Sequence, residues 1–148
     1  MDEICYKPIG VVHSPIRSED HMPPRPVKAR DVEGTVELLP DMIDGLMNLE
    51  GFSHIVLLCH LHLSSGFSLV VKPPSDSERH GVFATRSPRR PNPIAMSIVR
   101  LMHIEGPTLH IKDIDMVDGT PVLDIKPYIP LKYDEDTVRT GWLAKQYK

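Results

Sequence analysis

Apolar residues occur along the chain in short runs, and a proline or a glycine follows most of them. In residues 33–39, Val36 and Leu38 alternate with polar or small residues, which is the period of a half-buried strand. Two later runs flank the turn Glu105-Gly106-Pro107 and predict a β-hairpin. Strands are predicted at residues 7–13, 33–39, 52–63, 67–71, 94–103, 108–111 and 122–125. Many short strands with proline and glycine between them predict an all-β fold, either a barrel or a sandwich.

The run at residues 52–63 is apolar on both of its faces, which predicts a central strand or one whose outer face is covered. Its histidines, His54, His60 and His62, have even numbers and are expected to point the same way. Such spacing allows a zinc site, but no carboxylate or cysteine nearby completes a ligand set. The favoured interpretation is that one of these histidines contacts a small ligand.

Three segments do not follow the strand pattern. Residues 17–30 are polar and rich in proline and predict a long loop, either functional or a surface arm. Residues 41–49 predict one or two helical turns. The tail from residue 134 onward predicts a short amphipathic helix with Val138, Trp142 and Leu143 facing inward.

The most unusual stretch is GVFATRSPRRPNPIAMS, residues 81–97. Its three prolines stiffen the backbone and exclude regular helix or central strand. Arg86, Arg89 and Arg90 make it strongly positive. A rigid loop with guanidinium groups suits an anionic or carboxylate-bearing ligand, although a solvated surface turn has the same composition.

A second polar run, residues 111–130, contains Asp113, Asp115, Asp118 and Asp124. The spacing does not match a calcium-binding loop. These carboxylates are candidates to bind ligand hydroxyl or amino groups or to accept a proton, while Asp118 and Asp124 are equally suited to hydrogen-bond their own turns. The chain lacks the glycine-rich nucleotide fingerprints and the Gly-x-Ser-x-Gly motif, which disfavours NTPase, Rossmann and hydrolase classes.

The totals fit one domain over residues 1–148 with a net charge of -3 and 15 prolines. Cys5 and Cys59 form no CxxC motif and are expected to be reduced thiols. No apolar run is long enough to span a bilayer, so a cytoplasmic location is expected.

Four motifs resemble one known family: PIGVVHSP (8–15), GLMNLEGFSHIVLL (45–58), the stretch at 81–97, and DGTPVLDIKPYIP (118–130). The chain is similar along nearly its whole length to the TrmO family, also called YaeB-like. The resemblance implies a dimeric β-barrel with S-adenosyl-L-methionine near the subunit interface, and methylation of N6 of N6-threonylcarbamoyladenosine at position 37 of tRNA. Longer relatives carry a C-terminal domain that is not expected here. Alternatives are a methyltransferase with another acceptor and a non-catalytic cofactor- or RNA-binding module.

The resemblance also implies roles for individual residues, and it implies no metal site. The cofactor is expected to contact Pro26, Val27, Lys28, His62, Leu63, Arg86, Met96, Lys112, Asp113, Ile114 and Asp115. The residues expected to orient the substrate or accept its proton are Asp118 and Asp124, with Lys126 and Tyr128 contacting the substrate. The residues expected to bind tRNA are Arg89, Arg90 and Asn92.

Overall fold

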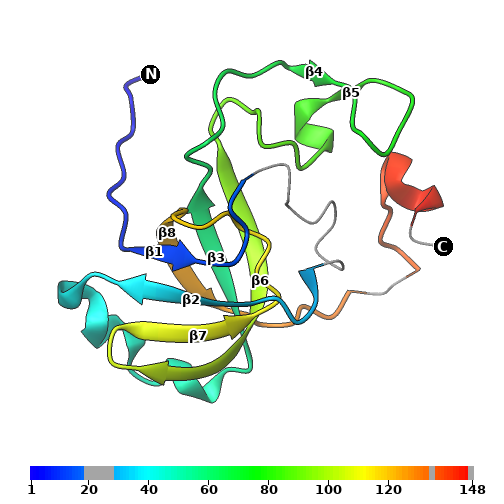
Figure 1. Cartoon of the computed structure of the whole chain (residues 1–148). Helices are drawn as coiled ribbons and strands as arrows, with labels where there is room; N and C mark the ends of the chain where they lie inside the picture. The colour runs from blue at the N-terminus through cyan, green and yellow to red at the C-terminus, as the bar shows by residue number, and fades with distance from the viewer. Residues whose placement is uncertain (19–28, 134–135, 147–148) are drawn as a thin grey trace.

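A computed structural model describes residues 1–18, 29–133 and 136–146, and it shows a closed six-stranded barrel (Figure 1). The strand order around the barrel is β1-β2-β7-β6-β3-β8, and all neighbouring strands are antiparallel. The barrel strands are β1 (Gly10–His13), β2 (Glu33–Leu38), β3 (His54–His60), β6 (Ile94–Glu105), β7 (Thr108–Lys112) and β8 (Pro121–Pro127). The predicted all-β barrel is therefore confirmed.

The core of the barrel is built from alternate residues of each strand. Val36 and Leu38 of β2 are buried as predicted, and Ile55, Leu57 and Cys59 of β3 have no exposed surface. Strand β3 pairs with β6 on one side and β8 on the other, so the predicted central strand is confirmed. Its outward residues, Val56 and Leu58, are only partly exposed.

The two ends of the barrel differ. At one end β1, β3 and β7 finish and β2, β6 and β8 begin, and we call this the loop end. The long connection from β3 to β6 lies here and carries β4 (Val70–Val71), β5 (His80–Gly81) and the 3₁₀ helix η5 (Val82–Ala84), drawn in green above the barrel in Figure 1. At the opposite end are the β6–β7 hairpin turn and the 3₁₀ helices η3 (Pro40–Leu46) and η4 (Leu49–Gly51).

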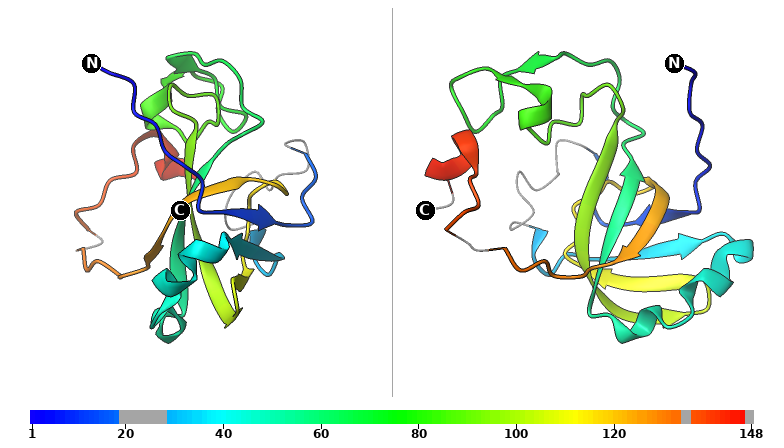
Figure 2. Two further views of the ribbon diagram at one scale, coloured as in Figure 1. Left: turned by 90° about the vertical axis from the view of Figure 1, so that its left-hand side faces the viewer. Right: turned by 180° about the vertical axis from the view of Figure 1, so that it is seen from behind.

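The helical predictions are only partly correct. Residues 41–49 form 3₁₀ turns, with Leu46 buried. Near the C-terminus, the 3₁₀ helix η6 (Gly141–Lys145) lies beside the β4–β5 connection in both Figure 1 and Figure 2. Trp142 stacks on His80 there, but Val138 is 54% exposed because it precedes the helical turn, so its predicted inward position was wrong. In the described part of the chain, no helix is long and apolar enough to cross a membrane.

Candidate functional site at the loop end of the barrel

Most of the residues that the sequence singled out belong to segments at the loop end. The segment after β1, the β3–β6 connection and the β7–β8 connection all meet there. The backbone amide of Gly119 donates to the carbonyl of Val12 at 2.8 Å, and that of Asp118 donates to Ile16 at 2.7 Å. These bonds hold the Asp118-Gly119 turn against β1 and the segment that follows it.

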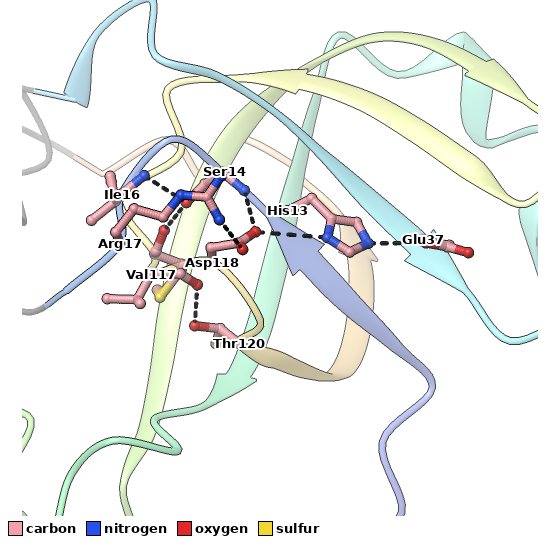
Figure 3. Close-up of polar contacts among 9 residues, drawn as sticks. His13, Ser14, Ile16, Arg17, Glu37, Val117, Asp118 and Thr120 are labelled. Atoms are coloured by element: carbon pink, nitrogen blue, oxygen red, sulfur yellow. Dashed lines mark hydrogen bonds and ion pairs between the residues drawn. The ribbon is translucent and has the colours of Figure 1, made fainter.

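Asp118 joins the β7–β8 connection to the segment that follows β1 (Figure 3). Its Oδ1 accepts from the backbone amide of Ser14 at 3.1 Å, and its Oδ2 accepts from the guanidinium of Arg17 at 2.8 Å. Ser14 in turn donates its hydroxyl to the carbonyl of Met116 at 2.6 Å. Asp118 thus stabilises a distant segment and not its own turn, and its side chain keeps 28% of its surface exposed.

Asp113 belongs to a second network, centred on Arg100 of β6. Nε and one terminal nitrogen of Arg100 each donate to Asp113 at 2.7 Å, and that terminal nitrogen also donates to Asp31 at 2.6 Å. The Arg100 guanidinium lowers the pKa of both carboxyl groups. Because Asp31 and Asp113 both have positive φ angles, of 66° and 73°, this charge network holds two strained backbone positions together.

Asp115 has a different environment from the other acidic residues. Its carboxylate accepts a hydrogen bond of 2.5 Å from the hydroxyl of Ser97, which is buried on the inner face of β6. Burial raises the pKa of Asp115, whereas the Ser97 bond and the charge of Arg86 act to lower it. Burial also raises the pKa of the Cys59 thiol to about 12, with a further contribution from Asp115. The loop end therefore contains a partly buried carboxylate, Asp115, whose pKa is influenced by the charge of the exposed Arg86.

The other predicted cofactor residues occupy varied positions. His62 lies against the Asp118-Gly119 turn, with its Nε2 3.9 Å from the place where a Cβ on Gly119 would stand, and Leu63 is exposed. Lys112 pairs with Glu33 at 3.2 Å. Ile114 is fully buried against Gly34, so neither its side chain nor its backbone is exposed to a ligand in this structure. Pro26, Val27 and Lys28 lie outside the described residues.

Met96 lies on the outer face of β6, in contrast to its inward neighbour Ser97. It is 49% exposed and stands directly opposite Leu58 of β3. Together with neighbouring outward residues it forms what we call the outer strip, made of Val56, Leu58, Ile94, Met96 and Ile98.

The four predicted catalytic residues are not gathered in one place within a single chain. Asp118 lies at the loop end. Asp124 and Lys126 form an ion pair of 2.8 Å on β8, opposite Leu58 and Val56 of the outer strip. Tyr128 follows β8 and contacts His54 near the opposite end. Because the seven residues of β8 separate them, Asp118 and Tyr128 are about 20 Å apart along the strand direction.

The predicted tRNA-binding residues lie on the proline-rich loop before β6. Arg89 and Asn92 are exposed. Arg90 folds back, and one of its guanidinium nitrogens donates to the carbonyls of Thr85 at 3.1 Å and Ser87 at 3.3 Å. Part of the hydrogen-bonding capacity of Arg90 is thus used to stabilise its own loop.

The sequence patterns do not identify Ser97, Arg100 and Asp31 as members of the site. A signal existed for Ser97, because it is a polar residue in phase with Val99 and Leu101, which face the core. No local signal existed for Arg100, since its partners come from the segments before β2 and after β7, far away in the chain.

The histidines of β3 do not form a ligand set. His54 and His60 flank the outward residues of the strand, whereas His62 lies beyond its end. Among the described residues, the cluster with metal-binding geometry is a different one, on β6 and β7.

Comparison with known proteins gives one consistent family. Residues 11–135 match the family model described as "tRNA-methyltransferase O N-terminal domain". A protein of Pyrococcus abyssi named "Probable S-adenosyl-L-methionine-binding protein" is 50% identical over 142 residues, covering 96% of this chain and 77% of that protein. The Escherichia coli tRNA (adenine(37)-N6)-methyltransferase is 39% identical over 140 residues, covering 88% of this chain and 60% of the enzyme.

A solved structure supports the same family. The crystal structure of TrmO from Pseudomonas aeruginosa superimposes with a TM-score of 0.77 at 38% sequence identity, covering 95% of this chain and 63% of that one. The chain thus spans somewhat less than two thirds of the E. coli enzyme and of the P. aeruginosa structure.

Proposed function

Because the chain belongs to the tRNA-methyltransferase O N-terminal domain family, we propose that it is a methyltransferase that uses S-adenosyl-L-methionine to methylate tRNA at N6 of adenine 37. We further propose that the acceptor is N6-threonylcarbamoyladenosine. The observation that carries the proposal is the environment of Asp115 at the loop end, where burial raises the pKa of this partly buried carboxylate and the charge of the exposed Arg86 acts to lower it.

This pair of charges suits the cofactor. Its amino-acid end carries a carboxylate and an ammonium group, and its sulfonium carries the methyl group that is transferred. A guanidinium binds a carboxylate through paired hydrogen bonds. Burial raises the pKa of Asp115, so a cationic or hydroxyl-bearing ligand that binds there would stabilise its charged form.

The remaining cofactor residues then have separate tasks. Arg100 already neutralises Asp113, so Asp113 shapes the binding loop and does not supply a free charge. Ile114 is fully buried and supports the loop from beneath, while His62, Leu63 and Lys112 supply side chains at the mouth of the barrel. The predicted contacts of Pro26, Val27 and Lys28 remain part of the proposal.

We infer that two copies of the chain pair through the outer strip. Exposed apolar side chains on two adjacent strands form a contiguous patch, the kind of surface that a partner covers. Asp124 and Lys126 border that patch on β8. A dimer formed in this way accounts for predicted catalytic residues that lie apart in one chain, since each site then draws on both copies.

The acceptor requires positioning and the loss of a proton. In-line methyl transfer depends on the alignment of the two reacting atoms, which a rigid site supplies. Asp118, held by Ser14 and Arg17, is the proposed orienting or proton-accepting group at the loop end. Arg89, with Asn92 beside it, is the proposed contact for tRNA phosphates.

The test uses total tRNA from a strain that lacks the gene. We expect a mass gain of one methyl group on the threonylcarbamoyl-modified nucleoside after incubation with protein and cofactor. Methylation of unmodified adenine 37, or of another nucleoside, would instead identify a different acceptor. Saturable binding of cofactor and tRNA without any methylated product would mean that the chain is a binding module.

A further inference from the structure

The β6–β7 hairpin carries a cluster of side chains that the proposed function does not use. His103 and Glu105 come from β6, and His110 comes from the neighbouring strand β7. One potential ligand atom from each residue can be chosen so that all three lie within 4.8 Å of one another. Most of the loop-end residues belong to connections at the other end of the barrel, so the cluster is separate from the proposed active site.

A β-bulge explains why the three side chains share one face. Val99 and Leu101 point into the core, which would also turn His103 inward in a regular strand. The pairing register shifts between Leu101 and His103, so Met102 is an extra residue and lies exposed. The bulge reverses the alternation, and His103 and Glu105 therefore point outward beside His110.

The hairpin holds the three side chains close together. His103 pairs directly with His110 across the strands, and their rings are stacked with centroids 4.1 Å apart at 10°. Nε2 of His110 lies 3.5 Å from Oε2 of Glu105. Gly106, with a φ of 59°, allows the tight turn that joins the strands.

These distances suit a tetrahedral metal ion. Zinc bonds to imidazole nitrogen at about 2.0–2.1 Å and to carboxylate oxygen at about 2.0–2.2 Å, so two tetrahedral ligands lie about 3.4 Å apart. The His110–Glu105 distance already matches, and rotation of the His103 and His110 rings out of their parallel stack would direct both nitrogen lone pairs at one ion. Two imidazoles and one carboxylate form a ligand set that zinc accepts, with the fourth position left to water.

We propose that His103, Glu105 and His110 bind a zinc ion on the outer surface of the barrel and that this ion fastens β6 to β7. The site involves none of the residues assigned to cofactor or tRNA. The proposed zinc site can therefore be tested independently of the methyltransferase activity.

The test is titration of the untagged, EDTA-treated 148-residue chain with zinc chloride by calorimetry. Cys5 is an exposed free thiol and could also bind zinc, so all proteins carry Cys5→Ser. We expect saturable binding of one ion per chain and a rise in the midpoint of thermal unfolding with zinc. Magnesium should not compete, because it prefers an all-oxygen set of ligands.

Two variants and one control identify the ligands. His110→Ala and the isosteric Glu105→Gln should each weaken zinc binding more than about tenfold, since even loss of a group that merely supports a ligand costs that much. His60→Ala removes an exposed histidine from another strand and should leave zinc affinity unchanged. Circular dichroism in EDTA verifies that each variant is folded.

Several outcomes would overturn the proposal. They are an absence of saturable zinc binding, equal affinity in the parent and the Glu105→Gln protein, and an equal loss of affinity in His60→Ala. In each case the cluster would be an ordinary pair of stacked imidazoles with a carboxylate beside them.

Discussion

Replacing Ser97 by alanine removes the hydrogen bond to Asp115 and tests whether that carboxylate is ionised at the mouth of the barrel. Ser97 is buried, and its hydroxyl lies 2.5 Å from Oδ1 of Asp115. Hydrogen bonds to charged groups contribute about 1.5–3 kcal/mol. Asp115 is only partly exposed, so we expect Ser97→Ala to lower the free energy of unfolding at neutral pH by about 1–2 kcal/mol. For a chain of this length that loss corresponds to a fall of about 2–8 °C in the unfolding midpoint.

The pH dependence of this loss is the decisive part. Burial already raises the pKa of Asp115 above its unfolded value, and the bond to Ser97 opposes the rise, so its removal raises the pKa further. A carboxyl group whose pKa is higher in the folded state than in the unfolded state stabilises the folded chain fully at pH values below the unfolded-state pKa. This stabilisation is lost as the pH rises through the folded-state pKa. The difference in unfolding free energy between wild type and Ser97→Ala should therefore grow from about pH 4 to about pH 8.

Thr120→Val provides a matched control. Thr120 is equally buried, and its hydroxyl donates to the carbonyl of Val117 at 2.6 Å, a neutral acceptor. Its loss should cost about 1 kcal/mol at every pH. Urea unfolding of the three proteins at both pH values gives the comparison. A Ser97→Ala loss that is as independent of pH as that of Thr120→Val would refute the assignment of an ionised Asp115.

Four further predictions follow from the proposed function. Arg86→Ala should weaken cofactor affinity by about tenfold or more in calorimetry, whereas Arg79→Ala, in the same β3–β6 connection, should leave it unchanged. Equal cofactor affinities of the two variants would show that Arg86 does not contact the cofactor. Asp118→Asn should reduce turnover with unchanged cofactor affinity, and undiminished turnover would exclude its role in proton transfer or orientation. Arg89→Ala should weaken tRNA binding and lower the slope of log affinity against log salt by about 0.7–0.9, whereas an unchanged slope would show no phosphate contact. Ile98→Asp should convert a dimer to monomer in light scattering, and a dimer that persists would contradict pairing through the outer strip.

The barrel could be predicted from the sequence because its signals are local. Val36 and Leu38 alternate with polar or small neighbours, and the two-sided run around Leu57 indicates a strand with neighbours on both sides. The bulge at Met102 could not be predicted, because a bulge changes the alternation by a single residue in the middle of an apolar run. For this reason His103 did not stand out as a surface residue.

The sequence predicted which segments carry the candidate residues, but not how those residues are arranged. Motifs identified the segments that contain Arg86, Asp115 and Asp118, and the structure brings these segments to one end of the barrel. The hydrogen-bond partner of each carboxylate is determined by closure of the barrel. Closure depends in turn on contacts between distant parts of the chain, which no local motif reveals. The networks of Arg100 with Asp113 and of Arg17 with Asp118 are both of this kind.

The acidic residues of the β7–β8 connection therefore fall into two groups, those with a cationic hydrogen-bond partner in the described part of the chain and one without. Arg100 lowers the pKa of Asp113, and Arg17 pairs with Asp118, so both carboxylates already have a cation in the protein and fix the loops around them. Asp115 has a serine hydroxyl as its hydrogen-bond donor, and burial raises its pKa. A buried carboxylate without a bound cation destabilises the folded chain, and a ligand that supplies positive charge relieves that cost. Among these three carboxylates, Asp115 is thus the one that we propose to contact the cationic cofactor.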